Sequence, residues 1–257
     1  AIEKNPSIRR IPTAFTVKAC GTGLPEPVLR LAVAIHADGH FPRPATHRSP
    51  SPESCVIAVR KERKKARLRA LLAAAGVEYE ERGGSEHRPT EIRFIFKSPY
   101  IGKSFDTQQW WGADARELHV IMDEIQHWDG LFEGADTRFS TSRRGDADFI
   151  QYATHATGGR ATISTTTYAD RPNWADTFIV HIAPAGSRKA PVLVRGDTCT
   201  IKRIQAPGGK QYCFQTPSTF FLARHNGCVF VTGNSGKTTP CLFKILYNRI
   251  YASKNIK

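Results

Sequence analysis

The chain has 257 residues, with 37 Lys and Arg against 23 Asp and Glu, so its formal net charge is +14. Hydrophobic residues make up 40% of it, which is enough to fill a core and excludes collagen-like and disordered proteins. No apolar run approaches the ~20 residues of a membrane span and no signal peptide opens the sequence, so we expect no membrane partner. Because Ala1 rather than Met comes first, we expect a processed chain or a fragment.

The positive charge is concentrated near the C-terminus. Residues 1–195 carry 28 Lys and Arg against 22 Asp and Glu, whereas residues 196–257 carry 9 against 1. Such a surplus favours a polyanionic partner, most simply nucleic acid, and the alternative is a basic protein whose charge only aids solubility. The six cysteines show no zinc-finger spacing, so a structural zinc is not expected and a reducing compartment is.

The first strongly periodic segment is residues 28–39 (VLRLAVAIHADG), which we predict to be a helix. Leu31, Ile35 and Asp38 share one face of it, with Asp38 at the C-terminal end. Alanines at positions 32, 34 and 37 keep this helix narrow, so another helix can approach closely. A second segment of this kind, residues 118–130 (LHVIMDEIQHWDG), also ends in Asp-Gly and places Asp129 like Asp38.

An internal repeat follows each of these helices. The segments that begin at residues 56 and 138 are each predicted to form a strand and then a helix, and a glycine ends each helix. The intervals from Ile57 to Gly76 and from Phe139 to Gly158 are both 19 residues. Return strands are expected at residues 91–97 and 177–182. The repeat predicts a pseudo-twofold α+β domain, and the alternative is chance similarity between two ordinary segments.

If the two helices pack side by side, Asp38 and Asp129 become neighbours. Two close carboxylates need a shared proton or cation, and oxygen ligands favour Mg²⁺, which also binds phosphates. Two carboxylates that hold a divalent cation beside a basic surface would form a site suited to hydrolysis of a phosphodiester. The alternative is that each Asp-Gly simply ends its helix, with glycine in the left-handed conformation.

Basic side chains cluster at matching places in the two halves. The first cluster is Arg60, Lys61, Arg63, Lys64, Lys65, Arg67 and Arg69, and Arg143 and Arg144 stand at the equivalent place in the second half. We expect Arg60, Lys61, Lys64, Arg143 and Arg144 to contact DNA phosphates, while strand side chains read base edges in the major groove. Part of the first cluster is alternatively a solvated helix face.

The nonapeptide at residues 31–39 (LAVAIHADG) resembles the signature of LAGLIDADG homing endonucleases at six of nine positions, and residues 122–130 resemble a degenerate second copy with Trp128 in place of a small residue. The resemblance covers roughly residues 20–185. It implies a monomeric pseudo-twofold αββαββα fold, repeated, with two sheets that straddle double-stranded DNA. It also implies Asp38 and Asp129 as metal-binding catalytic residues, with Mg²⁺ or another divalent cation, and Lys97 or Lys189 as a supporting base.

After residue 185, short strands are expected at residues 192–194, 199–204, 212–215, 220–223 and 229–231, with an Asn226-Gly227 turn before the last. They lead to Ser235-Gly236-Lys237-Thr238, the second half of a P-loop. A complete P-loop is excluded, because Val231 stands where its first glycine belongs and too few residues follow.

Residues 212–216, 221–224 and 226–234 are similar to the C-terminal splicing blocks of inteins, in which endonucleases of this kind are often inserted. The resemblance implies an all-β Hint splicing domain, with Asn234 as the cyclising residue and Ser235 as the nucleophile that follows it. His225 would assist proton transfer unless it is an ordinary turn histidine, and Cys213 stands where the family often uses Asp or Cys unless it is a buried structural thiol.

Together these features predict four regions. A linker at residues 1–19 precedes an endonuclease at 20–185, a splicing segment at 186–234 and a fragment of a host P-loop ATPase at 235–257. No N-terminal splicing block is visible before residue 20, so we expect either a fragment of an intein or the C-terminal partner of a split intein that acts in trans. We expect a cytoplasmic protein of a bacterial or phage-infected cell. The alternative is a DNA-binding protein without nuclease activity in a degenerate or split intein.

Overall fold

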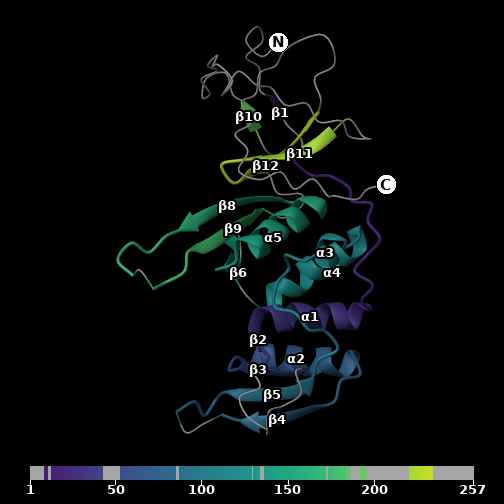
Figure 1. The fold of residues 1–257 in the computed structure, drawn as a ribbon, viewed down its shortest axis with the longest axis vertical. Coiled ribbons are helices and arrows are strands. Elements are labelled where there is room, and N and C mark those ends of the chain that lie inside the picture. Colours follow the sequence, from purple (N-terminus) through teal and green to yellow (C-terminus); the bar gives the residue numbers. More distant parts are fainter. Residues whose placement is uncertain are drawn as a thin grey trace.

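The structure, a computed structural model, describes residues 9–10, 13–42, 53–84, 87–128, 130–133, 136–171, 173–183, 185, 192–194 and 220–233. These residues have a mixed α/β fold in which helices lie between two sheets (Figure 1). Among the described helices, none combines the length and the apolar character that crossing a membrane requires.

The first half of the repeat forms one four-stranded sheet and two helices. Its elements are α1 (Glu26–Asp38), β2 (Gly39–His40), β3 (Ser54–Val59), α2 (Glu62–Ala74), β4 (Tyr79–Gly83) and β5 (Ile92–Lys97). The strands lie in the order β2-β3-β5-β4, and every neighbouring pair is antiparallel.

The second half repeats this arrangement. After a short helix, α3 (Gln108–Trp111), come α4 (Ala115–Glu124), the 3-10 turn η1 (Ile125–His127), β6 (Leu131–Glu133), β7 (Asp136–Thr141), α5 (Arg144–Ala156), β8 (Arg160–Thr166) and β9 (Thr177–Ala183). Its strands lie in the order β6-β7-β9-β8, which matches the first sheet position by position. The pseudo-twofold organisation predicted from the repeat is therefore present in the structure.

The pairing register of the strands shows that equivalent residues of the two halves occupy equivalent positions. Ile57 lies opposite Phe94 between β3 and β5, and Phe139 lies opposite Val180 between β7 and β9. All four side chains are buried. Because side chains alternate between the faces of a strand, these residues fix which face of each sheet packs against the helices.

Helix α1 lies at the centre of the core. It packs against α2, α4 and β3, and its residues from Leu31 to Ile35 are completely buried. Pro27 in its first turn suits a helix start, so the helix begins slightly before the predicted residue 28. The expected side-by-side packing of the two motif helices is confirmed for α1 and α4.

The second motif helix differs from the prediction of one helix through residue 130. The α-helix α4 ends at Glu124, and the chain continues as η1. Trp128 then leaves the helical conformation, with φ −115° and ψ −91°, and its buried indole Nε1 donates a hydrogen bond of 2.9 Å back to Glu124 Oε1. Burial of this large ring beside the end of α4 accounts for the early end, and Asp129 itself lies outside the described residues.

Part of the segment after residue 185 joins these layers. β10 (Val192–Val194) pairs with β1 (Arg9–Arg10), and β11 (Phe220–His225) and β12 (Cys228–Gly233) form a hairpin that extends the second sheet beyond β8. The predicted Asn226-Gly227 turn is confirmed, since both residues have positive φ. The strands expected at 199–204 and 212–215 lie outside the described residues, and a separate Hint domain stays a prediction.

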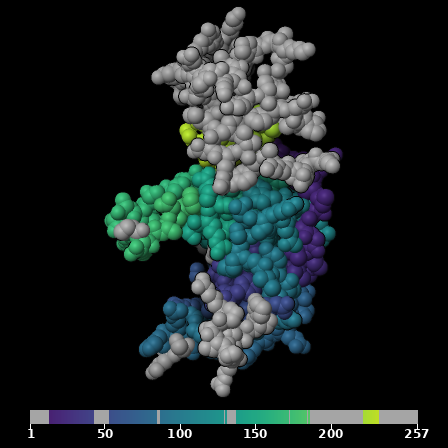
Figure 2. Space-filling model, in the orientation of Figure 1, coloured from purple at the N-terminus to yellow at the C-terminus, as the bar shows by residue number. Residues whose placement is uncertain are grey.

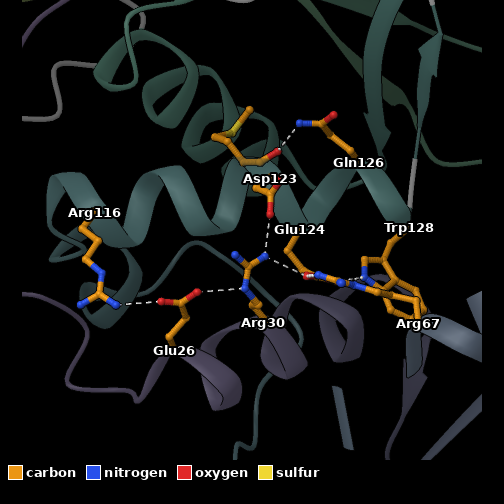
Figure 3. A network of polar contacts seen from close by, with 9 residues as sticks. Glu26, Arg30, Arg67, Arg116, Asp123, Glu124, Gln126 and Trp128 are labelled. Carbon is orange, nitrogen blue, oxygen red and sulfur yellow. Dashed lines mark hydrogen bonds and ion pairs between the residues drawn. The ribbon is translucent and has the colours of Figure 1, made fainter. Parts of the chain in front are cut away.

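A buried carboxylate links three helices from both halves (Figure 3). The side chain of Glu124, which is 0% exposed, accepts hydrogen bonds from Arg30 on α1 at 3.2 Å and from Arg67 on α2, whose Nε lies 3.1 Å away. Arg67 Nη2 also bonds to the same carboxylate, and hydrogen bonding to Glu124 raises the pKa of Arg67. Arg30 reaches Glu26 and Asp123 as well, so α1, α2 and α4 are tied by one network.

Replacing Glu124 with alanine should lower the free energy of unfolding by about 3–5 kcal/mol, because two guanidinium groups would lose a buried partner. Urea unfolding followed by circular dichroism measures this change. Glu81→Ala is the matched control, since it breaks a carboxylate–arginine pair with Arg69 that is largely solvated, and should cost far less. Equal losses in the two variants would contradict a central role for Glu124.

Candidate functional site

Asp38 occupies the junction between α1 and the first sheet. It is the last residue of α1, and Gly39 starts β2 directly with an extended backbone, φ −72° and ψ 151°. The left-handed glycine expected of an ordinary helix end is therefore not found here. Glycine is required for another reason: a Cβ at position 39 would lie 2.5 Å from the Ile35 carbonyl oxygen. The tight turn from helix to strand fixes where the Asp38 carboxylate lies.

A lysine from the other helix of the same half neutralises this carboxylate. Lys64, in the first turn of α2, places Nζ 2.5 Å from Asp38 Oδ2, and the two side chains are 13% and 25% exposed. The same ammonium group lies 5.6 Å from the centre of the buried Trp128 ring. Lys64 was expected to contact DNA, and in the structure it faces Asp38 instead.

Sequence reasoning missed a second lysine at this junction. Lys103, in the connection between the two halves, donates hydrogen bonds to the carbonyl oxygens of Ile35, His36 and Gly39 at 3.1, 2.9 and 2.6 Å. A cation there is favourable because the carbonyl groups at a helix C-terminus carry partial negative charge. No sequence signal could have found it, since Lys103 belongs to neither repeat and stands alone in an irregular segment.

His36, two residues before Asp38, is enclosed by aromatic rings. Phe105 and Trp110 lie 4.3 and 4.8 Å from its ring centre, and the Tyr100 hydroxyl lies 3.2 Å from Nε2. Burial lowers the pKa of His36 to about 3, with a further contribution from the positive charge of Lys103. His36 is therefore neutral at physiological pH and serves the packing around the end of α1.

Lys97, one of the two proposed supporting bases, does not lie at this junction. Lys97 is 79% exposed at the end of β5 and pairs with Glu53 at 2.8 Å, and that hydrogen bond raises its pKa. Lys189 lies outside the described residues.

The described residues include only one half of the expected Mg²⁺ site, Asp38. Among them, no group of three or more His, Cys, Asp or Glu side chains gathers where a metal ion could bind. Asp38 is one carboxylate and already has an ammonium counter-charge, which repels a divalent cation. Its predicted partner, Asp129, is outside the described residues.

The remaining basic residues fall into two kinds. Lys61 and Arg143 are the N-cap residues of α2 and α5, stand 82 positions apart and are both exposed. In contrast, Arg60 lies 3.5 Å from Glu91, and Arg144 pairs with Asp148 at 2.9 Å and packs over the Phe178 ring. The symmetric pair at positions 61 and 143 is therefore better placed for an external anion than the other expected contacts.

The faces of the two sheets that turn away from the helices carry exposed polar side chains among partly buried apolar ones. On β5, exposed Arg93 and Lys97 alternate with buried phenylalanines, and on β9 exposed His181 stands between two buried residues. The hairpin arms β4–β5 and β8–β9 project to the same side of the molecule, and the surface is hollowed between them (Figure 2). Two related sheets thus border one concave side.

Of the predicted splicing residues, the described part of the chain includes His225. His225 lies opposite Cys228 at the turn, whereas Gly233 lies opposite Phe220 at the other end of the hairpin. Five residues of strand separate the two ends, or about 17 Å. His225 is therefore far from the Gly233 end, where Asn234 follows. Cys213, Asn234 and Ser235 lie outside the described residues.

Comparison with known proteins finds solved structures whose fold is similar to that of this chain. No protein-family model matches the chain, and no curated protein matches it. Solved structures that resemble it include mesophilic variants of the homing endonuclease I-DmoI, with 12% identity, a TM-score of 0.44 and coverage of 62% of this chain and 88% of that one. A structure of I-DmoI in complex with DNA and Mn has 14% identity and the same TM-score, with coverage of 62% and 89%.

A further similar structure is full-length DUF199/WhiA from Thermatoga maritima, with 9% identity, a TM-score of 0.41 and coverage of 62% of this chain and 54% of that one. The N-terminal LAGLIDADG domain of DUF199/WhiA has 11% identity, a TM-score of 0.40 and coverage of 62% and 79%. The similar structures therefore include a homing endonuclease and a LAGLIDADG domain.

Replacing Lys103 with methionine should lower the free energy of unfolding by about 1.5–3 kcal/mol, because charge-assisted hydrogen bonds to the end of α1 are lost. Thermal and urea unfolding measure the change. Lys97→Met removes the same charge from an exposed strand end and serves as the control. If both variants unfold like the wild type, Lys103 does not stabilise this junction.

Proposed function

We propose that this chain binds double-stranded DNA in the hollow between the hairpin arms of its two sheets. The observation that supports this proposal is that the arms β4–β5 and β8–β9, which belong to the two pseudo-symmetric sheets, project to the same side of the molecule and border one hollow (Figure 2). A symmetric pair of strand surfaces suits the major groove, which admits β-strands and displays a distinct pattern for each base pair. Both halves belong to one chain, so a monomer is sufficient.

Phosphate contacts are assigned to the exposed basic N-caps of α2 and α5. Lys61 stands three residues before Lys64, which contacts Asp38, so it lies at the same end of the helices as that carboxylate. Arg143 takes the equivalent position in the second half. Two cations related by the pseudo-twofold axis can each contact one strand of a duplex.

Changing both Lys61 and Arg143 to alanine should weaken binding about equally for every DNA sequence and reduce the slope of log K against log salt concentration by about 2, since each lost phosphate contact reduces it by about 1. Fluorescence anisotropy with a labelled duplex at several salt concentrations measures this slope. Arg116→Ala is the control, because Arg116 is 80% exposed but pairs with Glu26 at the opposite end of α1 from Asp38. An unchanged slope in the double variant would contradict these contacts.

The second candidate function is site-specific cleavage of the bound duplex, dependent on Mg²⁺ or another divalent cation. The position of Asp38 favours it, since a partly exposed carboxylate ends α1 where α1 packs beside α4. Incubation of the duplex from the uninterrupted host gene with Mg²⁺ tests cleavage, and Asp38→Asn is the control. Binding without cleavage identifies a DNA-binding protein that lacks nuclease activity.

We also propose that residues 186–234 act in protein splicing and that the chain breaks after Asn234. The support is the sequence similarity to splicing blocks and the β11–β12 hairpin, whose last residue, Gly233, directly precedes Asn234. The N-terminal part of an intein would complete the reaction, and we assign residues 235–257 to a host P-loop ATPase.

Mass spectrometry of the chain incubated with an N-terminal intein fragment should reveal a product that ends at residue 234. Asn234→Ala should abolish it, because alanine has no side-chain nitrogen to attack the main-chain carbonyl. Persistence of the product in that variant would overturn the splicing function.

A further inference from the structure

A row of polar side chains crosses the face of the second sheet that turns away from the helices. His181 on β9 lies opposite Arg138 on β7 and Thr162 on β8. Its neighbours along the strand, Val180 and Ile182, are buried, whereas His181 is exposed. Because residues that pair directly across strands have their side chains on the same face, Arg138, His181 and Thr162 form one outward row.

The first sheet has an equivalent row with different chemistry. In the pairing register, Ile95 on β5 is the counterpart of His181, and it lies opposite Val56 on β3 and Glu80 on β4. Ile95 and Val56 are half-buried, and Ile95 also lines a surface pocket. Glu80 is exposed but pairs with Arg82 on the same strand at 2.8 Å. The middle of the row is therefore aliphatic in the first half and carries hydrogen-bonding groups in the second.

A hydroxyl group fixes the orientation of His181. Ser164 on β8 places Oγ 2.9 Å from His181 Nε2, and both side chains are exposed. With Ser164 as the donor of this bond, the ring proton is on Nδ1, which is left to donate to another molecule. A donor that is already oriented loses little conformational freedom when it binds, so His181 is well suited to recognition.

We propose that the two rows read different bases at symmetry-related positions of a DNA site, guanine through His181 and thymine through Ile95. The inference rests on the proposed binding of double-stranded DNA. In the major groove guanine presents two acceptors, N7 and O6, and hydrogen bonds from His181 and Arg138 match them. Thymine presents a methyl group there, and the aliphatic side chains of Ile95 and Val56 match it.

The same groups discriminate against the other bases. A guanidinium group has no acceptor, so Arg138 beside the Nδ1–H of His181 disfavours the amino groups of adenine and cytosine. An amino group against Ile95 would lose its water without gaining a partner. Because Ile95 and His181 are equivalent in the repeat, we expect the two bases at the same distance from the centre of the site.

Selection of bound duplexes from a randomised library by the wild-type chain tests these assignments. The selected site should carry guanine at one position and thymine at the position related to it by symmetry. His181→Gln should change the preference from guanine to adenine, because glutamine can both accept from N6 and donate to N7 of adenine. Ile95→Ser should remove the thymine preference and leave the guanine preference unchanged.

Base analogues in the selected duplex test single atoms. Deoxyuridine in place of thymidine removes only the methyl group and should weaken wild-type binding about threefold. Replacement of guanine by 7-deazaguanine removes the N7 acceptor and should weaken it about fivefold. Ile95→Ser should not respond to the first analogue, and His181→Ala should not respond to the second. Fluorescence anisotropy measures each affinity.

Matched variants separate base reading from stability of the sheet. Ser164→Ala should lower the preference for guanine because the His181 ring is no longer held, and Ser164→Thr keeps the hydroxyl and should restore it. Glu81→Ala changes the opposite face of β4, where Glu81 pairs with Arg69, and should alter neither preference. Urea unfolding of every variant identifies any loss of binding that is due to loss of the fold.

The outcomes distinguish this inference from the function on which it rests. An unchanged guanine preference in His181→Gln would overturn the role of His181, and equal affinity of the wild type for thymidine and deoxyuridine would overturn that of Ile95. Wild-type binding that is equal for all duplexes leaves DNA binding in place and overturns base reading by both rows. If the wild type binds no duplex, the proposed function fails.

Discussion

The structure depends on one buried charge. Glu124 on α4 lies between Arg30 on α1 and Arg67 on α2, so a carboxylate of the second half is neutralised by two arginines of the first. Helices that meet through small residues can slide and still make contact, whereas charges removed from water must stay paired. The network therefore sets how α1, α2 and α4 lie relative to one another. With α1 and α2 held in this way, Lys64 on α2 reaches Asp38 on α1.

The two halves share a topology but differ at the ends of their motif helices. In the first half, α1 continues to Asp38 and turns directly into β2, and Lys64 and Lys103 bring positive charge to that end. In the second half, α4 ends at Glu124 and Trp128 closes the segment. The carboxylate that ends α1 is thus paired with a lysine, and the carbonyl groups at the same helix end are capped by a second lysine.

The repeat, and the matched strands and helices that follow from it, could be predicted because they depend on periodic patterns within short segments of the sequence. The 19-residue intervals from Ile57 and Phe139 predicted the matched strands and helices, and the Asn226-Gly227 turn followed from its residue types. The ion pairs could not be predicted, because they join residues far apart in sequence with no pattern between them. Lys64 looked like one of seven similar cations, and Lys103 like an isolated surface lysine. In the same way, nothing in residues 220–233 indicated that they would extend the sheet of the repeat.

Net charge therefore does not indicate which basic residues of this chain are free to bind an external anion. Of the first basic cluster, Lys64, Arg67 and Arg69 pair with carboxylates of the chain itself. A cation already paired with a buried carboxylate gains little from a phosphate, since it must lose one partner to take the other. The exposed N-caps Lys61 and Arg143 have no carboxylate partner among the described contacts, so neither would lose one on binding a phosphate. Because these two residues are also related by the pseudo-twofold symmetry, which a DNA duplex shares, the proposed phosphate contacts follow from the arrangement of the two halves rather than from the total charge.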